Sequence, residues 1–70
     1  MKYQDEIITL REHIEETGKT ISQLCGDYIA YDESGMRETL TDALLDEIHK
    51  QGVLSASLLY MLAENMKQDE

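Results

Sequence analysis

The sequence lacks several residue types that end helices or stabilise the cores of small domains. Its 70 residues contain no proline, tryptophan or phenylalanine, and they include a single cysteine, Cys25. One thiol can form neither an internal disulfide nor the set of thiolates that a structural zinc site requires. A domain of this size buries only about 60% of the surface that its unfolded chain exposes. We therefore expect a thin core that needs support from oligomerisation or from a protein partner.

Basic residues are also scarce. Six Lys and Arg stand against fifteen Asp and Glu, which gives a formal charge of −9. Nucleic acids and anionic lipid surfaces are bound by clustered Lys and Arg, so we expect no direct nucleic-acid binding and no membrane association. The longest apolar stretch, residues 53–63, is too short to span a bilayer, and the N-terminal residues lack the apolar run of a secretory signal. We expect a cytoplasmic protein.

Hydrophobic periodicity predicts helices in the first half of the chain. Apolar residues recur every third or fourth position from Tyr3 to Ile14, which predicts a helix over residues 3–16 that ends at Gly18. Thr20 and Gln23 have the spacing of a capping box and predict the start of a second helix that reaches about residue 31.

The second half of the chain has a similar pattern. Residues 32–35 have the composition of a turn, and a third helix is predicted over residues 36–51, ended by Gly52. Ser55 or Ser57 can cap a fourth helix to Lys67 that is apolar nearly all round. The sequence thus predicts one all-α domain over residues 1–70, a small bundle of three to four short helices. The expected core is Ile7, Leu10, Ile14, Ile21, Leu24, Tyr28, Leu40, Leu44, Ile48, Leu58 and Leu62.

No motif for catalysis, cofactor binding or metal binding is complete. Residues 17–20 read Thr-Gly-Lys-Thr, like the end of a phosphate-binding loop, but His13 occupies the place of the first glycine. Asp46 precedes His49 by the three residues that di-iron bundles use, without the second such motif that those sites need. Cys25 lies on the apolar side of a predicted helix and is expected to be a buried hydrophobe. We therefore expect no enzyme, no cofactor and no metal.

Three functions fit an acidic shell over a sparse apolar interior. The first is a protein–protein interaction module, an adaptor or inhibitor of the kind that phage and mobile bacterial elements often encode, which binds a basic protein partner through an acidic rim and an apolar centre. The second is a homodimeric structural, assembly or chaperone-like protein. The third is a nucleic-acid mimic that blocks a DNA- or RNA-binding protein with its carboxylates.

Two sets of candidate contact residues follow from these hypotheses. Acidic residues near the predicted turns are candidates for binding a partner, and they are Glu12, Glu15, Glu16, Asp32 and Glu33. Large apolar residues of the fourth predicted helix and its approach are candidates for contacts in an oligomer, and they are Leu54, Leu59, Met61 and Met66.

Overall fold

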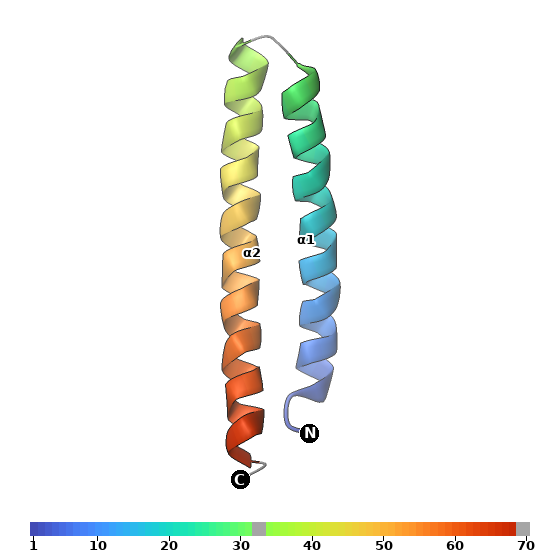
Figure 1. Ribbon diagram of the computed structural model, residues 1–70, viewed down its shortest axis with the longest axis vertical. Helices are drawn as coiled ribbons and strands as arrows, with labels where there is room; N and C mark the ends of the chain where they lie inside the picture. The colour runs from blue at the N-terminus through green and yellow to red at the C-terminus, as the bar shows by residue number, and fades with distance from the viewer. Residues whose placement is uncertain (32–33, 69–70) are drawn as a thin grey trace.

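Two long helices form an antiparallel hairpin. The computed structural model describes residues 1–31 and 34–68, which contain α1 (Gln4–Ala30) and α2 (Ser34–Gln68). The helices lie side by side along their length, and the two ends of the chain lie at the same end of the hairpin (Figure 1). The all-α prediction is confirmed. The prediction of three to four short helices is wrong, because the predicted segments join in pairs into two helices.

The predicted helix ends at Gly18 and Gly52 are wrong. Both glycines lie inside helices, and none of the described glycines has a positive φ. A glycine within a helix costs about 1 kcal/mol relative to alanine, whereas burying one Leu or Ile side chain stabilises a fold by about 1.5–3 kcal/mol. Because the chain has no proline, every residue at these points keeps the N–H that a continuous helix uses.

The predicted capping box at Thr20 is wrong for a related reason. Thr20 lies inside α1, and its hydroxyl donates a hydrogen bond to the carbonyl of Glu16 at 3.2 Å. Thr9, Thr39 and Thr41 bond the carbonyl four residues earlier in the same way. The Thr20 hydroxyl thus forms its hydrogen bond with the preceding turn of the same helix, and it does not cap the start of a new one.

The break between the helices falls where the sequence predicts a turn. α1 ends at Ala30, and the Tyr31 N–H donates to the Asp27 carbonyl at 2.9 Å. Ser34 and Gly35, which the turn prediction included, already belong to α2, while residues 32 and 33 lie outside the described part of the chain. The position of the hairpin turn is therefore predicted to within a few residues.

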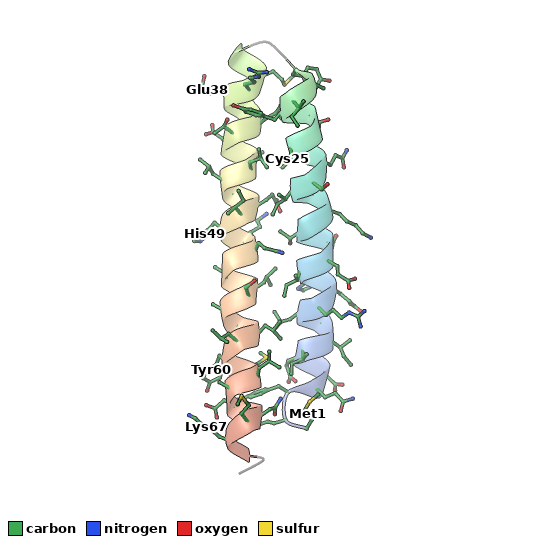
Figure 2. The ribbon with its side chains drawn as sticks, viewed as in Figure 1. Met1, Cys25, Glu38, His49, Tyr60 and Lys67 are labelled. Atoms are coloured by element: carbon green, nitrogen blue, oxygen red, sulfur yellow. The ribbon has the colours of Figure 1, made fainter. Side chains whose placement is uncertain are left out.

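Each helix packs on the other through a row of positions spaced alternately by three and four residues, here called the inner seam. This spacing is the heptad repeat of coiled coils. In α1 and the residue before it the inner seam is Tyr3, Ile7, Leu10, Ile14, Thr17, Ile21, Leu24 and Tyr28, and in α2 it is Arg37, Leu40, Leu44, Glu47, Gln51, Leu54, Leu58, Met61 and Asn65. Figure 2 shows side chains of the two helices meeting along the hairpin.

The core is thin. Leu40 is the one hydrophobic residue that is buried in the described chain, at 8% exposure, and the other inner-seam residues are only partly buried or, for Tyr28, exposed. Ile48 and Leu62, which the sequence places in the core, are exposed. Within the expected core, Ile48 follows Leu44 by four residues and Leu62 follows Leu58 by four, where the inner seam steps by three. A row that always steps by four turns gradually around the helix and leaves the inner seam.

Side-chain contacts close both ends of the hairpin. At the turn, Arg37 Nε donates to the Tyr31 carbonyl at 2.8 Å, and its guanidinium lies 5.3 Å from the centre of the Tyr28 ring. At the other end, the rings of Tyr3 and Tyr60 lie 6.5 Å apart, centre to centre, with Lys2 5.0 Å from the Tyr3 ring. These contacts fix which residues of α1 and α2 lie at the same level.

The hairpin is a narrow rod. Its Cα atoms extend over 55 × 14 × 13 Å, and its radius of gyration is 16.2 Å. A compact domain of this length has a radius of gyration of about 11 Å. With 35 residues against 27, α2 extends past the start of α1 (Figure 1). Neither described helix contains an apolar stretch that would carry it across a membrane.

Candidate interaction surface

A second row of positions on α2 lies beside the inner seam, on one side of the hairpin. This row follows the inner seam by one residue and repeats with the same alternation of three and four. Its part from Leu45 onward, here called the outer seam, consists of exposed and uncharged residues, namely Leu45, Ile48, Gly52, Ser55, Leu59, Leu62 and Met66. Nearer the turn the same row contains Glu38 and Thr41, which are also exposed. Leu59 and Met66 are 70% and 71% exposed. A helix with two such rows has two surfaces for packing against other helices, and this chain fills only one of them.

The corresponding positions of α1 lie on the same side of the hairpin. In antiparallel helices, a step of one residue toward the C-terminus turns both helices toward the same side. The positions one residue before the inner seam should then lie together on the opposite side of the hairpin. They do, because one open groove is lined by His13 and Glu16 of α1 and by Lys50 and Val53 of α2. The α1 row that joins the outer seam is Ile8, Arg11, Glu15, Gly18, Ser22, Cys25 and Ile29. Together the two rows form the outer face.

The outer face is almost free of charge in a chain of charge −9. Its charged members are Arg11 and Glu15, which pair with each other at 3.1 Å, and Glu38 adds one carboxylate to the same α2 row near the turn. No residue from Gln51 to Ala63 is charged. The acidic residues therefore lie around the outer face and on the opposite side of the hairpin, so that a nearly neutral apolar strip has an acidic border.

Three of the five predicted partner-binding carboxylates lie in the described part of the chain. Glu12, Glu15 and Glu16 are exposed near the middle of α1, while Asp32 and Glu33 lie outside the described residues. The sequence places Glu15 and Glu16 at a helix end, close to the start of the next helix. That placement is wrong, because α1 continues for 14 residues beyond Glu16, about 21 Å. Glu16 faces the groove beside His13, and Glu15 lies in the outer face.

The predicted oligomer contacts divide between two surfaces. Leu54 and Met61 belong to the inner seam and are partly buried against α1, whereas Leu59 and Met66 belong to the outer seam and are exposed. Whether any of them contacts a second chain stays a prediction. Leu59 and Met66 are placed where such a contact is possible.

Groups with chemical reactivity do not converge in the described chain. Cys25 is exposed, contrary to the expectation of a buried thiol, because it follows the inner-seam residue Leu24 by one position. His13 and His49 border the groove on the polar side with Lys50. Among the described residues, no three His, Cys, Asp or Glu side chains gather as metal ligands would.

Lys50 lies beside two carboxylates that change its titration. Its ammonium donates to Glu47 Oε1 at 3.1 Å and lies 3.7 Å from Asp46 Oδ2. The hydrogen bond to Glu47, followed by the charges of Glu47 and Asp46, raises the pKa of Lys50. Asp46 and Lys50 lie on the polar side of α2, and Glu47 reaches Lys50 from the inner seam.

The outer seam was missed by the sequence prediction although its signal is present. The three-and-four spacing from Leu45 to Met66 runs through Gly52 and Ser55. Taking Gly52 as a helix end splits this row between two short helices, and the fourth helix then looks apolar nearly all round. Only a continuous α2 resolves the pattern into an inner and an outer seam.

Fold and surface together define the class of this protein: an acidic two-helix hairpin of the coiled-coil type with one exposed apolar face. Comparison with protein families, with curated proteins and with solved structures finds no match to the chain.

Proposed function

We propose that this chain is a protein–protein interaction module that binds another polypeptide through its outer face. The observation that carries the proposal is the outer seam of α2, a row of exposed apolar and small residues at helix-packing spacing. Exposed apolar surface that is continuous and bordered by polar residues is typical of protein interaction sites. An adaptor or inhibitor needs only such a surface.

The spacing of the outer seam favours a helix as the bound element. Side chains repeated every three and four residues form the holes that receive the apolar knobs of a facing helix. Leu45 and Ile48 stand at one end of the outer seam and Leu59, Leu62 and Met66 at the other, with Gly52 and Ser55 between them. A bound helix can therefore approach closely at the centre and bury large side chains on either side.

The border of the outer face favours a partner with basic flanks. Asp42 lies one turn before Leu45 on α2, and Glu12 lies one turn after Ile8 on α1. Carboxylates at the rim of an apolar site attract a basic surface and orient it during association, while the apolar centre supplies most of the affinity. The nucleic-acid mimic stays an alternative hypothesis, which DNA competition for a bound partner would support.

A photo-crosslinking experiment tests the proposal. A benzophenone amino acid in place of Leu59, on the outer seam, is expected to form covalent adducts with protein in the source cell. The control carries the same amino acid in place of Val53, which is on the polar side of the same helix and is exposed to a comparable degree. Adducts from position 59 but not from position 53 support the module. No adduct from position 59, or equal yields from both positions, contradicts it.

A further inference from the structure

The size of the exposed surface indicates how large the contact on the outer face must be. The chain exposes 5409 Å² of accessible surface. A compact monomer of 8.0 kDa exposes about 4,450 Å², so the hairpin has an excess of about 950 Å². One side of a standard protein interface buries about 800 Å². Covering one long face of the hairpin would therefore give the chain the exposure of an ordinary folded protein.

All four glycines lie in helices with room for a Cβ, and two of them, Gly18 and Gly52, lie on the outer face. A Cβ built on either would meet nothing within 4 Å. Neither has a positive φ, so neither is required by its backbone conformation. Each nevertheless weakens its helix by about 1 kcal/mol relative to alanine. A helix from outside the hairpin that approaches closely at these points would give both glycines a structural role.

A second copy of this chain has the surface that the outer face requires. It presents the same helix-packing spacing, with large residues such as Ile48 and Leu59 to fill the space above the partner's glycines. The outer seam of the copy brings no charge, and Arg11 and Glu15 of its α1 row neutralise each other, so that Glu38 near the turn is the remaining carboxylate on this side. Two hairpins packed face to face have the arrangement of a four-helix bundle, in which every helix has two neighbours.

We propose that the outer face pairs with the outer face of a second copy, so that the chain is a symmetric dimer and forms a four-helix bundle. This inference rests on the proposed function, because it concerns the same surface, and it names a second copy of the chain as the occupant in place of a partner with basic flanks. The dimer buries the outer seams of both copies, with Glu15 paired to Arg11 within the contact, and leaves most other carboxylates of both hairpins on the outside. Its core contains the inner and outer seams, which explains why one hairpin has so little core of its own.

Sedimentation velocity at micromolar concentrations tests the dimer, with an expected mass of twice 8.0 kDa. Ile48→Lys places a charge in the outer seam and is expected to weaken the dimer at least about 30-fold, the loss of an interface hot spot. Val53→Lys is the matched control, since both residues are 53% exposed in the same helix. It should leave the dimer affinity within about threefold. Lysine reduces the net negative charge, so added repulsion between copies cannot explain a loss.

A second variant separates pairing from folding. Gly52→Leu introduces a better helix former at a place where the hairpin has room, so helix content measured by circular dichroism should hold or rise. The dimer should nevertheless weaken, because the new side chain fills the space of the approaching helix. Gly26→Leu, in α1 but off the outer face, should keep the dimer intact.

The outcomes distinguish this inference from the proposed function. A helical monomer throughout the micromolar range overturns the dimer, as does a dimer that Ile48→Lys and Gly52→Leu leave unchanged. If the chain is monomeric while position 59 still crosslinks to a different protein, the inference fails and the interaction module stands. If position 59 gives no adduct of any kind, both fail. An adduct of twice the chain mass supports both.

Discussion

At the scale of single residues, the polar members of the inner seam determine how well the two helices fit. Gln51 lies in the inner seam of α2, and its Oε1 atom is buried without a hydrogen-bond donor among the described residues. Both polar side-chain atoms of Asn65 are likewise buried without a hydrogen-bond partner among the described residues. A buried unpaired polar group costs about 1–3 kcal/mol, so these residues weaken the hairpin while opposing alternative registers of the helices.

Replacing Gln51 should therefore stabilise the protein. Gln51→Leu removes an unpaired acceptor and adds apolar surface to the seam, with an expected gain of about 1–2 kcal/mol in the free energy of unfolding. The control is Gln23→Leu, on the exposed polar side of α1, which should change stability by less than about 0.5 kcal/mol. Urea denaturation of both variants measures the difference. A loss of stability in Gln51→Leu would show that its amide is paired in solution.

The charge cluster on α2 makes a prediction about titration. Glu47 raises the pKa of Lys50 mainly through their hydrogen bond, and Asp46 adds a smaller effect through its charge. Because the pKa is raised in the folded chain, the stabilisation is present below the ordinary lysine pKa and is lost as the pH rises through the raised value. Glu47→Gln should lower the pKa of Lys50 more than Asp46→Asn does, as measured by NMR titration of the lysine side chain. The reverse order would contradict the hydrogen bond as the main cause.

At the scale of the helices, the turn end of the hairpin depends on Arg37. Its hydrogen bond to the Tyr31 carbonyl and its position near the Tyr28 ring connect α2 to the end of α1. Arg37→Ala should cost about 1–2 kcal/mol in the free energy of unfolding. Lys67→Ala is the control, because Lys67 forms an exposed ion pair with Glu64 within one helix and outside the outer face, worth about 0.5 kcal/mol or less. Thermal denaturation that gives equal losses for Arg37→Ala and Lys67→Ala would exclude a special role for Arg37.

The helices also show what local sequence signals can and cannot predict. The row from Tyr3 to Ile14 correctly predicts helix and inner seam, because its apolar side chains are large and evenly spaced. Gly18 and Gly52 mislead, since a glycine often ends a helix and its local cost does not reveal the packing that carries the helix through it. The residues of the outer face can be recognised as one row only when α2 is continuous. Predicting this surface from the sequence therefore required correct helix ends more than any motif.

At the scale of the whole molecule, shape and charge act together. A rod with Cα extents of 55 × 14 × 13 Å cannot enclose a core, so the apolar residues of the outer seam are exposed. If the proposed dimer forms, the formal charge of −9 opposes every approach of two copies, and it opposes least the approach that joins the nearly neutral outer faces. On that proposal the acidic composition would select an orientation and would not require a basic partner.

Salt separates the two occupants that the outer face could bind, because they carry opposite charges. Two copies of charge −9 repel each other at long range, and salt screens this repulsion, so the dimer should become tighter as ionic strength rises from about 0.05 to 0.5 M. A basic partner is attracted by Glu12 and Asp42, and the same screening should weaken that complex and slow its formation. Sedimentation equilibrium across this range measures the sign for the dimer. A dimer that dissociates as salt is added must be held by ion pairs between copies, which the pairing of neutral outer faces does not allow.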